Sequence, residues 1–110
     1  MKGRCNLKME ISLTAERVFI TMSSRLDEED ALVLEQQIKT YLAKGYNTYV
    51  FDMSHLQYID SAGLGTLLSI NKQALCQGGH VTLQGLCGTV AELFEITRLK
   101  AVFKTEEFSC

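Results

Sequence analysis

The chain has 110 residues with a formal net charge of −2, and 46% of them are hydrophobic and 22% charged. This length suits one domain with one core, so we expect a single domain over residues 1–110. The slight negative charge and the lack of a basic cluster argue against direct binding to nucleic acid, and no apolar run approaches the roughly 20 residues of a membrane helix.

The cysteines and histidines give little sign of a disulfide framework or a metal site. The four cysteines are dispersed, with no Cys-x-x-Cys pair, and the two histidines lie far apart. Scattered thiols, with no apolar stretch behind the N-terminal charges that could act as a signal peptide, favour a cytoplasmic protein with reduced cysteines. We therefore expect no metal and no cofactor.

The N-terminal part of the chain predicts a β-hairpin. Apolar and polar residues alternate over residues 7–13, and the pattern recurs over residues 18–22. This period of two is typical of half-buried strands. Because only a short connection separates the two runs, they should pair as antiparallel neighbours. The apolar positions are Leu7, Met9, Ile11 and Leu13, followed by Val18, Ile20 and Met22.

A helix is predicted to follow the N-cap residue Asp27. The acidic residues 28–30 suit the positive end of a helix dipole, and Lys44-Gly45 is a stop signal. Apolar residues at helical spacing would form its buried face: Ala31, Leu34, Ile38, Tyr41 and Leu42. The short apolar run at residues 49–51 predicts a strand that is buried on both faces.

The second half of the chain predicts two more helices and two more strands. After a loop over residues 52–59, a helix should run from about Ser61 to Gln77, with Gly78-Gly79 ending it. Residues 81–83 predict a strand, the spacing of residues 89–92 predicts a helix begun by a capping box, and residues 101–104 predict a short edge strand. The leucines of the second helix, which are Leu64, Leu67, Leu68 and Leu75, should be buried.

The order of elements is β-β-α-β-α-β-α-β, which predicts an α/β fold with a mixed sheet. Strands that alternate with helices normally form right-handed crossovers, and these make the central strands parallel.

Residues 59–65 break a local rule at the start of the second helix. Gly63 and Gly65 lie in or near its first turn, where each costs up to roughly 1 kcal/mol relative to Ala. Such a violation beside a hydroxyl and a carboxylate, those of Ser61 and Asp60, often marks a functional site.

Three chemistries are conceivable at this site. Ser61, His55 and Asp52 could form a Ser-His-Asp set, but the Gly-x-Ser-x-Gly pattern is lacking. Gly63-x-Gly65 could hold a phosphate, but the third glycine of a nucleotide-binding loop is missing. Alternatively, Ser61 accepts a phosphate, whose charge would repel a docked protein.

The phosphoacceptor hypothesis competes with a purely structural interpretation. In the first, Ser61 caps the helix while Gly63 and Gly65 let a partner approach closely. In the second, Ser61 is only a cap and the glycines only fit against a neighbouring strand. The residues alone do not separate the two interpretations.

The chain resembles a known family at residues 51–65, at Leu26-Asp27 and at Gly78-Gly79. The motif Asp60-Ser61-Ala62-Gly63-Leu64-Gly65 after an apolar strand and loop is similar to that of anti-sigma factor antagonists. These are single STAS-domain proteins of bacterial partner-switching systems. The resemblance implies a mixed sheet with helices largely on one face, and a binding protein with no catalytic residues.

The resemblance also implies partners and a switch. The partners would be an anti-sigma factor with serine-kinase activity, which phosphorylates Ser61 and so ends the binding, and a serine phosphatase that restores it. The partner surface would comprise Arg25, Asp27, Ser54, His55, Asp60, Ser61, Ala62, Gly63, Gly65 and Thr66. The alternative is a STAS module of a transporter or another signalling assembly that acts without phosphorylation.

Overall fold

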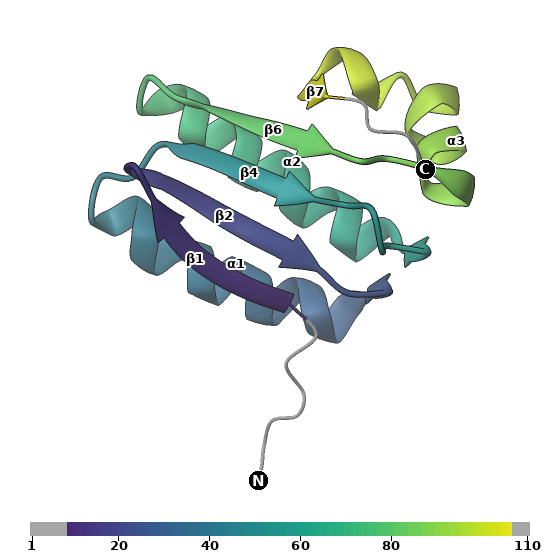
Figure 1. Ribbon diagram of the computed structural model, residues 1–110, viewed down its shortest axis with the longest axis horizontal. Coiled ribbons are helices and arrows are strands. Elements are labelled where there is room, and N and C mark those ends of the chain that lie inside the picture. The colour runs from purple at the N-terminus through teal and green to yellow at the C-terminus, as the bar shows by residue number, and fades with distance from the viewer. Residues whose placement is uncertain (1–8, 107–110) are drawn as a thin grey trace, which may run out of the picture.

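The computed structural model describes residues 9–106, which form a mixed α/β fold around a five-stranded sheet (Figure 1). The strand order is β1-β2-β4-β6-β7. β1 pairs antiparallel with β2, and every other neighbouring pair in this sheet is parallel, as predicted. The strands are β1 (Met9–Thr14), β2 (Arg17–Met22), β4 (Thr48–Asp52), β6 (His80–Gln84) and β7 (Lys104–Glu106).

The predicted hairpin is present, with a tight turn at Ala15 and Glu16. Their φ angles of 52° and 67° are left-handed, which matches the twist of the strands in a two-residue hairpin. Ile11 packs against the core, but Leu13 is 47% exposed because it lies at the end of an edge strand. Leu7, which was predicted to belong to the strand, lies outside the described residues.

Two helices, α1 (Glu28–Ala43) and α2 (Ser61–Cys76), cover one face of the sheet (Figure 1). The predicted face of α1 is confirmed, apart from a half-buried Tyr41. The prediction that Leu75 is buried is wrong, since it is 56% exposed. Leu67 is buried as predicted, and the rest of the buried stripe of α2 follows helical spacing through residues other than leucine; its members are Gly63, Leu67, Ile70, Asn71 and Ala74.

The central strand β4 is buried on both faces, as predicted. Tyr49 and Phe51 point into the core, and Val50 on the other face is only 4% exposed. The Tyr49 hydroxyl donates a hydrogen bond of 2.7 Å to the carbonyl of Tyr46, and burial raises the pKa of Tyr49 to about 12.

The C-terminal elements differ in detail from the prediction. Helix α3 (Gly88–Ile96) begins after Cys87, whose side chain makes no capping hydrogen bond, so the predicted capping box at residues 89–92 is wrong. A 3₁₀ helix, η2 (Leu99–Ala101), comes before β7 and displaces the strand toward the C-terminus.

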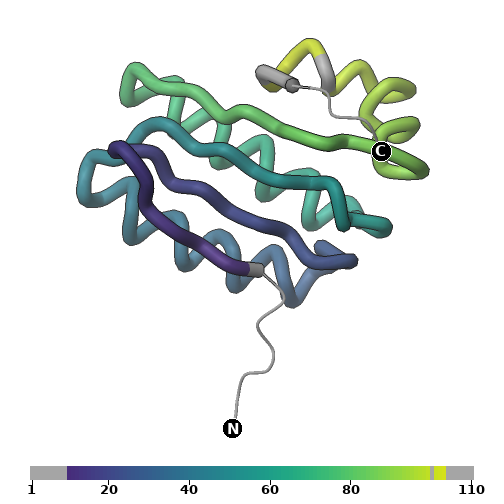
Figure 2. The backbone as a smooth tube through the Cα atoms, in the orientation of Figure 1, coloured from purple at the N-terminus to yellow at the C-terminus, as the bar shows by residue number. Residues whose placement is uncertain are grey.

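A second, two-stranded sheet was not predicted. β3 (Arg25–Leu26) pairs parallel with β5 (Tyr58–Ile59), and the backbone N–H groups of Gln57 and Tyr58 both donate to the carbonyl of Ser24. This pairing ties the segment after β2 to the segment before α2. Figure 2 shows that these segments meet at the same end of the molecule where α1, α2 and α3 begin.

In the described part of the chain, no helix has the length and apolar character needed to cross a membrane.

Candidate functional site

The candidate site lies at one end of the molecule, which we call the carboxyl edge. It comprises residues 23–27, 52–66 and 85–89, where β2, β4 and β6 end and the three helices begin. Parallel strands followed by helices bring such segments together, and ligands of open α/β sheets commonly bind there. The segment 59–65 that the sequence singled out lies at this edge (Figure 2).

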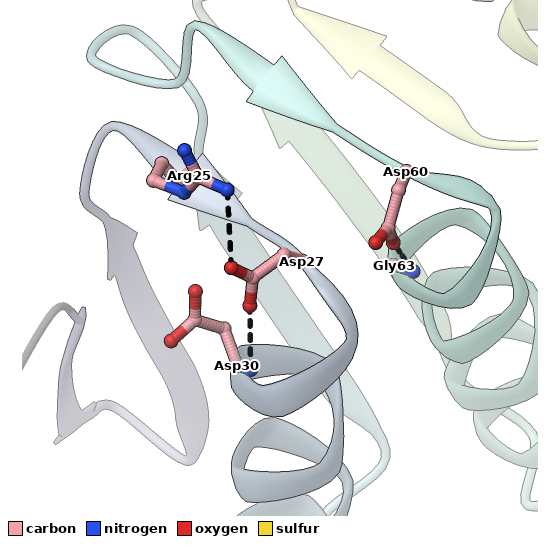
Figure 3. Close-up of polar contacts among 5 residues, drawn as sticks. All are labelled: Arg25, Asp27, Asp30, Asp60 and Gly63. Atoms are coloured by element: carbon pink, nitrogen blue, oxygen red, sulfur yellow. Dashed lines mark hydrogen bonds and ion pairs between the residues drawn. The ribbon is translucent and has the colours of Figure 1, made fainter.

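Asp60, rather than Ser61, caps helix α2. Its Oδ1 accepts a hydrogen bond of 2.9 Å from the backbone N–H of Gly63 (Figure 3). The prediction that Ser61 caps the helix is therefore wrong, because Asp60 continues the extended backbone of β5 while Ser61 is already helical. Ser61 is exposed, and no described residue hydrogen-bonds its hydroxyl. The hydroxyl therefore lies beside the helix end without a capping role.

The two glycines of the motif have different surroundings. A Cβ at buried Gly63 would lie 2.5 Å from the carbonyl oxygen of Leu26 and 2.8 Å from Cγ1 of Ile59. Packing against β3 and β5 therefore explains Gly63. A Cβ at exposed Gly65 would meet nothing within 4 Å, so nothing in the described fold requires glycine there. Only Gly65 remains available for close approach by a partner.

Arg25 and Asp27 lie beside the start of α2. The Arg25 guanidinium is 3.2 Å from Asp27 and 5.0 Å above the ring centre of Tyr58. Asp27 caps α1 by accepting from the backbone N–H of Asp30 (Figure 3). That hydrogen bond, and to a lesser extent Arg25, holds the pKa of Asp27 below its usual value.

The two helix caps are brought close by the short parallel sheet. The backbone N–H of Asp60 donates to the carbonyl of Leu26, at 3.3 Å, directly before Asp27. Tyr58, which is 47% exposed, was not predicted as part of this surface. An exposed aromatic residue followed by the apolar Ile59 is typical of a short strand. Two residues are too few, however, to establish the alternation that predicts a strand.

Ser54 and His55 belong to a separate turn at the same edge. Oδ1 of Asp52 accepts hydrogen bonds from the backbone N–H and the hydroxyl of Ser54, at 3.0 and 2.8 Å. Nδ1 of His55 is 3.4 Å from that hydroxyl. The contacts of Asp52 and His55 therefore involve Ser54, whereas a Ser61-centred hydrolase would need them at Ser61.

A cavity of about 390 Å³ lies between this turn and the start of α3. It is lined by Ser54, Leu56, Gln57, Cys87, Gly88 and Thr89. Within residues 9–106, no group of three or more His, Cys, Asp or Glu residues could hold a metal ion. Ala62 and Thr66 are half-buried on the first turns of α2.

Comparisons with known proteins agree with this architecture. The crystal structure of a Thermotoga maritima protein superposes with a TM-score of 0.84 at 24% identity, over 92% of this chain and 86% of that one. The Bacillus cell fate determinant SpoIIAA in its phosphorylated form gives 0.77 at 20% identity, over 92% and 91% of the two chains. At these identities the similarity establishes the fold.

Sequence comparisons identify the family. The anti-sigma-B factor antagonist of Bacillus subtilis is 25% identical over 97 residues, which is 88% of each chain. BtrV of Bordetella bronchiseptica is 33% identical over 78 residues, or 71% of this chain and 67% of that protein. The family model of the STAS domain matches residues 7–108. The chain therefore belongs to the STAS domain family, as its motif indicated.

Proposed function

We propose that this STAS domain is an anti-sigma factor antagonist. Through its carboxyl edge it binds an anti-sigma factor with serine-kinase activity and so frees a sigma factor. Phosphorylation of Ser61 ends the binding, and a serine phosphatase restores it. The observation that carries the proposal is the exposed Ser61, one residue beyond the group that caps α2.

The names of similar proteins support this role. Relatives from Bacillus subtilis and Listeria monocytogenes are both named anti-sigma-B factor antagonist, and each is 25% identical to this chain. The similar SpoIIAA structures are those of an anti-sigma factor antagonist in its unphosphorylated form and of SpoIIAA in its phosphorylated form. A binding protein of this kind needs no catalytic residue of its own.

The electrostatics of the carboxyl edge explain how phosphate would act. A phosphoserine carries about −1.5 to −2 charges at neutral pH. At the start of α2 this charge suits the helix dipole, so the domain tolerates it. The same edge already carries Asp27 and Asp60, with Glu28 and Glu29 next to it in the first turn of α1, and the phosphate adds bulk and negative charge beside them. A partner docked on the bare helix end is then displaced while the domain keeps its fold.

The docking surface comprises the parts of this edge that remain accessible. Its centre is the start of α2, with Ser61, Ala62, Gly65 and Thr66. Gly63 is buried beneath these residues and packs against Leu26. Arg25 belongs to β3 and Asp27 directly follows this strand, so both lie beside the centre. Ser54 and His55 belong to the exposed turn after β4.

Phosphorylation can be tested by incubating the protein with its cognate kinase and ATP and measuring the intact mass. We expect one added phosphate on the wild type and none on Ser61→Ala. Thr40→Ala, which removes an exposed hydroxyl of α1 away from this edge, is the matched control and should still gain the phosphate. A phosphate that persists on Ser61→Ala overturns the site, and an unmodified wild type that still binds its partner indicates a STAS module without a phospho-switch.

Binding can be tested by titrating the anti-sigma factor by calorimetry. Ser61→Asp should weaken binding by tenfold or more, about 1.4 kcal/mol, whereas Ser61→Ala should bind like the wild type. Gln36→Glu, which adds one charge on an exposed face of α1, controls for net charge and should change little. If Ser61→Asp and Ser61→Ala both bind like the wild type, the proposed switch is wrong.

A further inference from the structure

The outer edge of β1 has the properties of a strand that pairs with another chain. β1 lies at the end of the sheet order, and no described strand pairs with its outer side. It keeps a continuous register with β2 over six residue pairs, from Met9↔Met22 to Thr14↔Arg17. Lysine, proline and bulges are among the features that protect an edge, and Met9–Thr14 contains none of them; its one charged residue is Glu10.

The geometry of the hairpin indicates which backbone groups face outward. In a two-residue hairpin, the pair that flanks the turn is hydrogen-bonded, and inward and outward groups alternate from there. The flanking pair here is Thr14 and Arg17, so the outward N–H and C=O groups belong to Ile11 and Leu13. Leu13 also carries an apolar side chain that is 47% exposed at this edge.

An apolar groove continues from this edge onto helix α1. It has a volume of about 490 Å³ and is lined by Glu10, Ile11, Ser12, Thr21, Val33, Gln37 and Tyr41. Val33 and the adjacent Leu32 are 49% and 57% exposed. The helix stripe Val33, Gln37 and Tyr41 has a spacing of four residues, so it lies along one side of α1.

We propose that two copies of this chain associate through their β1 edges, antiparallel and related by a two-fold axis, to form one continuous sheet. Centring the pair on Ser12 puts Ile11 of each copy beside Leu13 of the other, on the face that α1 covers. The groove that joins Val33 to β1 lies at this edge, so the second copy brings its own α1 toward the exposed Val33. Helices that pack together lie about 8–10 Å apart.

Charge favours a second copy over another occupant of this edge. Antiparallel α1 helices place the acidic first turn of one copy, which contains Glu29, beside Lys44 at the end of the other. In the proposed pairing, Glu10 of one copy would lie opposite the uncharged Thr14 of the other, so no like charges would meet along the strands. An unrelated extended peptide could pair with β1 but would leave Val33 and Leu32 uncovered. The arrangement also points the two carboxyl edges in opposite directions, so both copies stay accessible to a partner.

The oligomeric state tests the proposal. This interface involves fewer residues than a standard stable one, so we expect a dissociation constant on the order of 100 µM or tighter. Analytical ultracentrifugation of the wild type should show a monomer-dimer equilibrium. Val33→Glu should abolish the dimer, because its carboxylate would be buried in the helix contact. Leu75→Glu makes a similar change at a 56% exposed residue of α2 and should leave the dimer intact.

Hydrogen exchange identifies the interface independently. The amides of Ile11 and Leu13 should become protected as the protein concentration rises, and Val33→Glu should remove that protection. A wild type that is monomeric at about 1 mM overturns the proposal. So does a Val33→Glu variant that dimerises as well as the wild type, or a dimer in which these two amides exchange as fast as in the monomer.

Discussion

At the scale of single residues, Gly63 and Gly65 should respond oppositely to alanine. Gly63→Ala drives a methyl group into the carbonyl of Leu26 and should lower the free energy of unfolding by about 2 kcal/mol or more. The methyl group of Gly65→Ala would have no other residue within 4 Å, and alanine has a higher helix propensity than glycine. This substitution should therefore be neutral or should stabilise the protein by up to about 1 kcal/mol. Urea denaturation measures both, and equal losses would contradict the packing described for Gly63.

Gly65→Ala also separates stability from binding. The same methyl group lies on the proposed docking surface, so it should weaken binding of the anti-sigma factor although the fold tolerates it. A variant that is stable and binds normally would remove Gly65 from that surface.

The contributions of Asp60 and Ser61 to stability should likewise be separable by mutation. Asp60→Ala leaves the N–H of Gly63 without its acceptor and should destabilise the protein by about 1 kcal/mol, as is usual for the loss of an N-cap. Ser61→Ala should change stability by less than about 0.5 kcal/mol, because this hydroxyl makes no capping bond. Asp60→Ser retains a capping group and is the control. A larger loss for Ser61→Ala than for Asp60→Ala would reassign the cap.

At the scale of elements, the strength of the sequence signal decided what could be predicted. Helix α1 has a capping aspartate, an acidic first turn and a periodic apolar face, and it was predicted well. β3 and β5 have two residues each, too short for any period, and their pairing depends on backbone contacts with Ser24 that no side-chain pattern encodes. Leu75 is hydrophobic, but its helical position lies outside the buried stripe of α2, so its hydrophobicity alone does not predict its exposure.

The start of α1 should make stability depend on pH. The pKa of Asp27 is below 3.8 in the folded protein, because its carboxylate accepts from the N–H of Asp30. The ionised group therefore stabilises the fold at pH values above 3.8, and this contribution is lost as the pH falls through the lower folded value. Asn also caps helices, so Asp27→Asn should change little at pH 7 but should lose less stability than the wild type on acidification.

Thermal unfolding followed by circular dichroism, at pH 7 and below pH 3.8, measures this difference. If both proteins lose the same stability on acidification, Asp27 is not the group responsible.

At the scale of the whole molecule, phosphorylation should leave the fold unchanged. Ser61 is exposed and lies outside the core that joins α1 and α2 to the sheet, so its charge has no buried contact to disrupt. NMR spectra of the wild type before and after phosphorylation should show shifts confined to residues 23–27, 52–66 and 85–89. Shifts that extend to the opposite end, such as around Asn47 or Gly78, would indicate a conformational change instead.

The location of the candidate site was predictable, but the division of roles within it was not. Alternating strands and helices place residues 59–65 at the carboxyl ends of the parallel strands, and the sequence is sufficient for that. Whether Asp60 or Ser61 caps the helix depends on where the extended backbone ends, and both residues are good caps. The contact between Gly63 and Leu26 spans distant segments, so no local pattern reveals it.

Because the cap and the proposed acceptor hydroxyl belong to neighbouring but different residues, α2 would not have to open for Ser61 to be modified. In the proposed switch, the lifetimes of the bound and released states would then depend on the turnover rates of the kinase and the phosphatase, and not on folding kinetics. Such a switch would pass through its cycles without exposing its core, and an exposed core is what makes a partly unfolded chain prone to aggregation.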